Sequence, residues 1–68
     1  MTDEDARVAR VLAMAKAVWG REDEARAFLE RPHPLLHDRR PVEVAAESAE
    51  GADRVIDVLG QLRHGSAA

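Results

Sequence analysis

The sequence predicts an all-α fold: a small compact bundle of about four helices, of which the first is the longest. Apolar residues recur at three- and four-residue spacing in the first and last thirds of the chain, as they do on one face of a helix. Glycine and proline stand where helices are expected to end or begin. No segment is predicted to form a strand, and the sequence contains no internal repeat.

The length of 68 residues limits the chain to one small domain, residues 1–68. A domain of this size buries only about 60% of the surface that its unfolded chain exposes and is marginally stable alone. The chain has no cysteine, so neither a disulfide nor a thiolate metal site can form. We therefore expect a stabilising partner, either a second copy or another protein.

Charge and hydropathy argue against two classes of partner. The formal net charge of −3 argues against nucleic-acid binding by this chain alone. No apolar run approaches the roughly 20 residues that cross a membrane. The acidic N-terminus does not resemble a signal peptide. These features predict a cytoplasmic protein.

The first helix is predicted from about Asp3 to Trp19. Gly20 follows it and supplies the positive φ that ends many helices. Thr2 or Asp3 is the expected N-cap, and the acidic residues of the first turn complement the helix dipole. An apolar stripe follows the helical period and contains Val8, Val11, Leu12, Ala15, Val18 and Trp19.

Two interpretations of this stripe are open. It can form part of the core, which is the ordinary role of such a stripe. Alternatively, the first half of the long helix, within residues 1–20, projects beyond the others and pairs with a second chain as a dimer seam. The residues predicted for such self-association are Val8, Val11, Leu12, Ala15 and Trp19.

A second helix is predicted from about Glu22 to Glu30, because Pro32 disfavours α geometry in the residue before it. The next nine residues, 32–40, form a loop that is long for so small a domain, and long loops are often functional. Its two leucines need cover, so we expect the loop to pack back on the core. The apolar edge of the second helix contains Ala25, Phe28 and Leu29.

Pro41 is predicted to begin a short third helix that ends near residue 46. Its inward pair is left open, as either Val42 with Ala45 or Val44 with Ala46. Ser48 is the expected N-cap of a last helix that extends to about residue 63 and leaves residues 63–68 as a C-terminal tail. The apolar face of this helix is expected to contain Val55, Ile56, Leu59 and Leu62.

No constellation of residues points to catalysis or to a bound metal or cofactor. His33 and His37 are four residues apart, but Pro34 lies between them in the predicted loop, where the helical ligand spacing does not apply. The carboxylates cluster at helix N-termini, where the helix dipole explains them. No serine lies in a nucleophile motif. We predict that the chain is not an enzyme.

A small basic patch can form from Arg39 and Arg40 with Arg31 and His37, and it would suit a phosphate or a carboxylate-rich partner. The alternative is that these arginines aid solubility and pair with acidic neighbours in the sequence: Glu30, Asp38 or Glu43.

One ordered set of residues spans most of the chain: Trp19-Gly20, Phe28-Leu29, Pro32-His33-Pro34, Arg40-Pro41-Val42, Gly51 and His64-Gly65. In order and spacing this set resembles the C-terminal toxin-binding domain of the Xre/MbcA/ParS antitoxins of bacterial toxin–antitoxin pairs. Two positions depart from the family pattern. His64 stands where tyrosine is expected, and Phe28 stands where tryptophan is usual.

The resemblance implies an antitoxin that neutralises a RES-domain toxin, an enzyme that consumes NAD or uses it for ADP-ribosylation, by occluding its active site. It also implies self-association, which we expect to give a homodimer. Full-length relatives usually carry a helix-turn-helix domain before this one, so the chain is expected to be a fragment or a short stand-alone member. The implied toxin-binding residues are Arg63, His64, Gly65, Ser66, Ala67 and Ala68, supported by Pro34, Leu35, Arg39 and Arg40 in the loop.

Two other functions are weighed against this one. The first is a small helical dimerisation or adaptor module without a toxin partner, in which the stripe on the first helix is the whole function. The second is an autonomous DNA-binding regulator. That function needs a basic recognition helix, whereas the second predicted helix begins with three acidic residues.

Overall fold

The computed structural model describes residues 2–64. They contain four α-helices and one 3-10 helix: α1 (Asp3–Trp19), α2 (Glu22–Glu30), η1 (Pro34–Leu36), α3 (Pro41–Glu47) and α4 (Ala49–His64). Extended pairing within this range is limited to an isolated bridge between His33 and Arg39. The all-α prediction, the order of the helices and the greater length of the first are confirmed.

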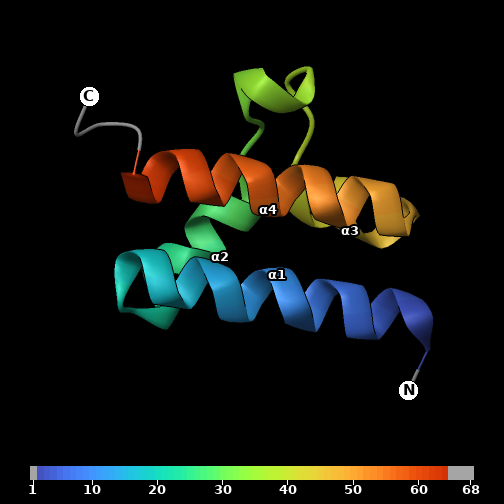
Figure 1. The fold of residues 1–68 in the computed structure, drawn as a ribbon, viewed down its shortest axis with the longest axis horizontal. Helices are drawn as coiled ribbons and strands as arrows, with labels where there is room; N and C mark the ends of the chain where they lie inside the picture. Colours follow the sequence, from blue (N-terminus) through green and yellow to red (C-terminus); the bar gives the residue numbers. More distant parts are fainter. Residues whose placement is uncertain (1, 65–68) are drawn as a thin grey trace.

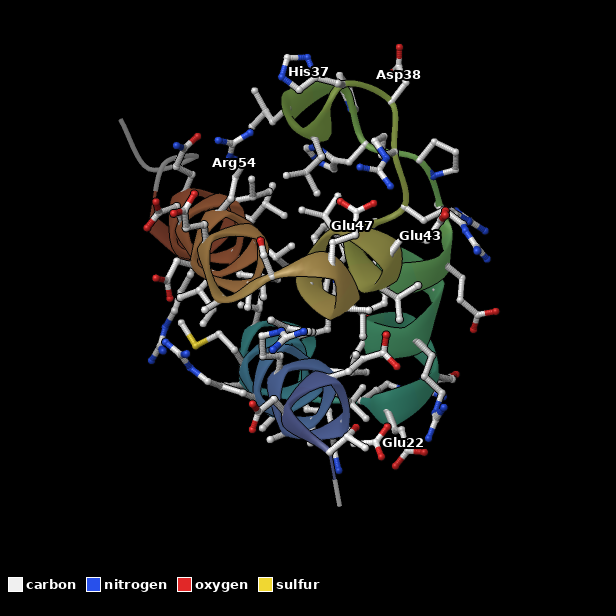
Figure 2. The ribbon with its side chains drawn as sticks, turned by 90° about the vertical axis from the view of Figure 1, so that its right-hand side faces the viewer. Glu22, His37, Asp38, Glu43, Glu47 and Arg54 are labelled. Atoms are coloured by element: carbon white, nitrogen blue, oxygen red, sulfur yellow. The ribbon has the colours of Figure 1, made fainter. Side chains whose placement is uncertain are left out.

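The two long helices, α1 and α4, lie side by side and run in the same direction (Figure 1). Because they are parallel, the chain between them must return along the bundle, and α2, η1 and α3 make this return. In the end-on view, α2 and α3 lie on one side of the α1–α4 pair (Figure 2). The core lies between these two layers.

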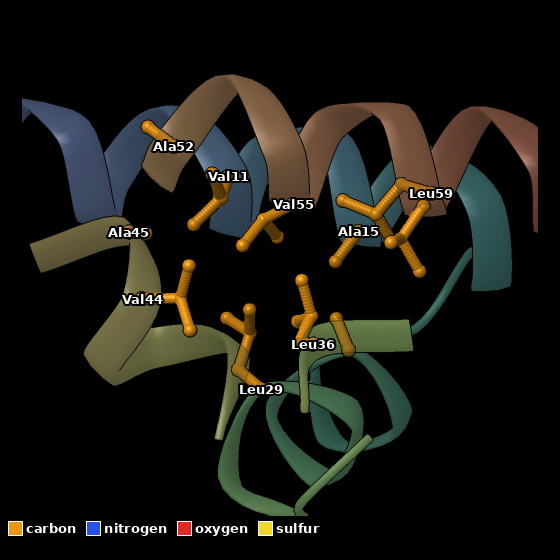
Figure 3. Close-up of a cluster of buried hydrophobic side chains, with 11 residues drawn as sticks. Val11, Ala15, Leu29, Leu36, Val44, Ala45, Ala52, Val55 and Leu59 are labelled. Atoms are coloured by element: carbon orange, nitrogen blue, oxygen red, sulfur yellow. The ribbon is translucent and has the colours of Figure 1, made fainter. Parts of the chain in front are cut away.

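The core consists entirely of apolar side chains, several of which meet in the centre of Figure 3. Full burial of one such valine or leucine contributes roughly 1.5–3 kcal/mol to stability, which matters in a domain with few of them. The buried apolar residues are Val11, Ala15, Ala25, Leu29, Leu36, Val44, Ala45, Ala52, Val55, Val58 and Leu59.

Both ends of α1 are capped as the sequence predicts. The Thr2 hydroxyl accepts a hydrogen bond from the Asp5 N–H at 3.1 Å, so Thr2 is the N-cap. Gly20 adopts φ 74°, and its N–H donates to the Lys16 carbonyl at 2.7 Å. This left-handed residue ends α1 and turns the chain into α2.

The loop after α2 covers only one of its two leucines. Leu36, at the end of η1, is 1% exposed and packs in the core, as expected. Leu35 is 55% exposed, so the expectation that both leucines are covered is wrong for this residue. The 3-10 turn is the reason, because adjacent side chains on so tight a helix point in different directions.

The inward face of α3 combines the two pairs that the sequence left open. Val44 and Ala45 are buried, whereas Val42 and Ala46 are half-buried. Neither predicted pair is therefore right. The helix packs against α1, α2 and α4 together, so its covered face is wider than one stripe.

Arg7 of α1 closes the C-terminal end of α3. Its Nε donates to the Ala45 carbonyl at 3.1 Å, and one of its terminal nitrogens donates to the Ala46 carbonyl at 2.7 Å. The last carbonyls of a helix have no partner within the helix, and a cation at this end also complements the helix dipole. Arg7 therefore joins the first half of α1 to the end of α3.

The last helix begins at the predicted cap, where the Ser48 hydroxyl accepts from the Gly51 N–H at 2.9 Å. It ends at His64, one residue beyond the predicted limit. On its apolar face, Val55 and Leu59 are fully buried, Ile56 is half-buried and Leu62 is 40% exposed. Ala52 and Val58 also belong to the core, although the sequence analysis did not include them.

Gly51 lies where α4 passes closest to α3. A Cβ atom on this residue would overlap the carbonyl oxygen of Val44 and lie 3.0 Å from its carbonyl carbon. Glycine is needed here because two backbones approach each other, and not because of an unusual φ. This contact explains in physical terms a glycine that the sequence analysis identified only through a family resemblance.

Candidate functional site

The surface at the C-terminal end of α4 contains an apolar groove, which we call the aromatic groove. Residues from α1, α2, the following loop and α4 converge on it: Trp19, Glu24, Ala27, Phe28, Arg31, Pro32, His33 and Leu62. The ring centroids of Trp19 and Phe28 are 5.0 Å apart, and those of Phe28 and His33 are 5.7 Å apart. These three rings therefore form one continuous cluster.

Three local features assemble this cluster. The turn at Gly20 folds α2 back on α1 and brings Phe28 to Trp19. Pro32 lies just beyond the end of α2, where it ends the helix and places His33 beside Phe28. The His33 ring is then held in place, because its Nδ1 accepts a hydrogen bond from the Leu35 N–H at 3.1 Å.

Leu62 connects the aromatic groove to the predicted toxin-binding tail. It is 40% exposed, lies on the last turns of α4 and lines the groove. Arg63 follows it and is exposed, and His64 is the last residue of α4. The other predicted tail residues, Gly65, Ser66, Ala67 and Ala68, lie outside the described residues.

The predicted loop residues divide into two groups. Pro34 and Leu35 are exposed at η1. Arg39 instead forms an ion pair with Glu47, with a second contact of 2.8 Å from its other terminal nitrogen. Arg40 donates to the Glu43 carboxylate at 2.6 Å. Of the predicted local pairs, the one between Arg40 and Glu43 is present, whereas Arg39 pairs across to α3.

These ion pairs affect the protonation of their members. Hydrogen bonding from Arg39 lowers the pKa of the Glu47 carboxyl below its ordinary value, and the same contact raises the pKa of Arg39. Glu43 raises the pKa of Arg40 in the same way. All four side chains are about half exposed, so these pairs contribute little to stability. The Arg39–Glu47 pair joins the loop to α3, whereas the Arg40–Glu43 pair lies within the first turn of α3.

A second apolar groove lies between α1 and α3, and we call it the α1–α3 groove. Its apolar lining residues are Val8, Ala9, Leu12, Val42 and Ala46, and its charged rim contains Glu4, Asp5, Arg26, Arg40 and Glu43.

The residues predicted for self-association are divided among three places. Val8 and Leu12 line the α1–α3 groove. Val11 and Ala15 are fully buried in the core of the same chain. Trp19 belongs to the aromatic groove. The stripe on α1 therefore serves both as core and as surface.

The described residues offer binding surfaces, and no buried ionisable group lies among them. Within residues 2–64, no three histidine or carboxylate side chains come together in a way that could hold a metal ion. None of the helices described is long and apolar enough to cross a membrane.

Three apolar lining residues of the aromatic groove, Trp19, Phe28 and Leu62, were predicted as helix positions, but the groove that they form was not predicted. Trp19 and Phe28 were noted as helix residues, and Leu62 was assigned to an apolar face. Trp19 and Leu62 both lie at the C-terminal ends of their helices. This shared position would have predicted that they lie close together if the two helices had been known to be parallel. The parallel arrangement is a property of the tertiary structure.

Comparison with known families gives a match over most of the chain. Residues 14–65 match the family model described as the antitoxin Xre/MbcA/ParS C-terminal toxin-binding domain. The match includes every residue that lines the aromatic groove, and all of α2, α3 and α4. No curated protein and no solved structure matches the chain significantly.

Proposed function

This chain belongs to the family of Xre/MbcA/ParS antitoxins, and we propose that it binds a RES-type toxin in the cytoplasm and neutralises it by occluding the toxin's active site. Its role is then that of a binding protein rather than an enzyme. One observation carries the proposal. The aromatic groove is lined by Leu62 in the last turn of α4, directly before the predicted toxin-binding residues Arg63 and His64.

The composition of this surface suits a protein partner. Interface cores are enriched in tryptophan, phenylalanine and arginine, and a few such residues supply most of the binding energy. Trp19 and Phe28 lie side by side in the groove, and Leu62 is exposed beside them. Arg31 lines the same groove, and within residues 2–64 it forms no ion pair. A toxin seated here would cover these side chains while residues 63–68 extend toward its active site.

Deletion of residues 63–68 tests the role of the tail. We expect the full chain to co-purify with the RES-type protein encoded beside it and to stop its NAD consumption. The deletion variant should lose inhibition, because the segment that enters the active site is gone. A thermal melt of the variant checks that the bundle still folds. Full inhibition by a folded deletion variant would contradict active-site occlusion by the tail.

We further propose that the chain forms a homodimer through the α1–α3 groove. An apolar strip lies there between an acidic end, with Glu4 and Asp5, and an end that contains Arg26 and Arg40, whose partners within the chain are the exposed carboxylates of Glu22 and Glu43. A two-fold axis across the strip would place the acidic end of one copy against the basic residues of the other. This surface is also the one that a dimerisation or adaptor module would use.

Substitution of one alanine on α1 tests this interface. Ala9 is exposed and lines the α1–α3 groove, so Ala9→Arg should convert the dimer to a monomer without disturbing the core. Ala13 is also exposed on α1 but does not line this groove, and Ala13→Arg is the matched control. Sedimentation gives the readout. A dimer that survives Ala9→Arg, or that Ala13→Arg dissociates, would place the interface elsewhere.

A further inference from the structure

The loop between α2 and α3 contains two consecutive residues in a conformation that most side chains disfavour. His37 has φ 58° and Asp38 has φ 59°, both in the left-handed region. The Arg39 N–H donates to the Leu36 carbonyl at 3.1 Å and closes a turn whose φ values resemble those of type I′. Such turns strongly favour Asn-Gly, because glycine adopts positive φ without steric cost.

The surroundings of this turn hold it in place. Leu36 is 1% exposed and anchors the loop in the core. The His33 N–H donates to the Arg39 carbonyl at 3.1 Å, and the His33 carbonyl accepts from the Asp38 N–H at 3.0 Å. Strained residues persist only where the structure around them dictates their conformation, and they are concentrated at functional sites.

The side chains of His37 and Asp38 lie at the exposed tip of the loop. Aspartate tolerates positive φ best when its side chain bonds to nearby backbone. Among the described residues, no hydrogen bond or ion pair involves the side chain of Asp38 or His37. Figure 2 shows both side chains directed away from the bundle. The neighbouring Leu35, at 55%, is more exposed than Leu62.

We infer that Leu35, His37 and Asp38 form a preformed recognition loop for the toxin. The toxin surface would receive Leu35 in an apolar recess and pair a cationic side chain with Asp38. Arg39 and Arg40 already form ion pairs with Glu47 and Glu43. The side chains at the exposed tip of the loop therefore supply its contacts with the toxin. A rigid loop loses little entropy on binding. The inference rests on the proposed function, because its occupant is the toxin.

The test replaces the tip by the pair that this turn favours, His37→Asn together with Asp38→Gly. Relief of backbone strain should raise Tm by about 4 °C. The loss of both side chains should raise the Kd for the RES-type toxin at least about tenfold. Leu35→Ser should weaken binding similarly with Tm unchanged. Asp57→Asn, at an exposed position on α4, is the control and should change neither quantity.

Binding of the unmodified chain to the toxin is measured first. If no complex forms, the proposed function and the recognition loop both fail. If the complex forms and the Asn-Gly variant binds equally well, the recognition loop is overturned while the proposed function stands. A lower Tm for the Asn-Gly variant would also overturn it, because the turn would then gain stability from His37 and Asp38.

Discussion

Replacement of Gly51 by alanine is expected to destabilise this domain by at least about 3 kcal/mol, the upper end of ordinary overpacking effects. The added methyl group would overlap the Val44 carbonyl oxygen, which is backbone and cannot move aside like a flexible side chain. α3 and α4 would have to separate, and the buried contacts between them would be lost. For a domain this small, such a loss is most of its stability. Urea unfolding followed by circular dichroism measures the effect.

Gly60 provides the matched control for this prediction. It lies in the same helix, and a Cβ atom there would meet no other atom within 4 Å. Gly60→Ala should therefore stabilise the domain by roughly 0.5–1 kcal/mol, because alanine loses less conformational freedom than glycine in a helix. Similar effects at the two positions would show that α3 and α4 do not approach as closely as described.

Leu62→Arg is expected to weaken binding to the toxin about 30-fold or more, which corresponds to the roughly 2 kcal/mol that defines an interface hot spot. Leu62 lines the aromatic groove and is 40% exposed, so a long charged side chain would block the groove and leave a charge inside the interface. Titration calorimetry or inhibition of NAD consumption gives the affinity. The fold should survive, because the buried contacts of Val55 and Leu59 remain.

The neighbouring Gln61 is the control for this substitution. It is exposed on the same turn of α4 and does not line the aromatic groove. Gln61→Arg adds the same charge one residue away and should bind the toxin normally. If both variants bind as tightly as the unmodified chain, the toxin does not use this groove. If both variants lose binding equally, the added positive charge near the tail causes the loss, and blockage of the groove does not.

Local chemistry was enough to predict the helices. The Thr2 cap, the left-handed Gly20 and the proline at residue 41 act within one or two turns of the chain, so their effects can be read from sequence order alone. The membership of Leu29, Val55 and Leu59 in the core followed from helical spacing for the same reason. The family was also recognisable from the order of these local features.

The sequence by itself therefore determined the helices, their order and much of the core. The tertiary structure decided which side chains are exposed and which come together. Leu35 and Leu36 are adjacent and point in different directions from the 3-10 turn, and the packing of this turn against α4 decides that Leu36 is the buried one. The aromatic groove joins residues far apart in the chain, and the contact between Gly51 and Val44 joins two helices at the point where they pack together. Such contacts depend on how whole helices pack, and no local spacing encodes that arrangement.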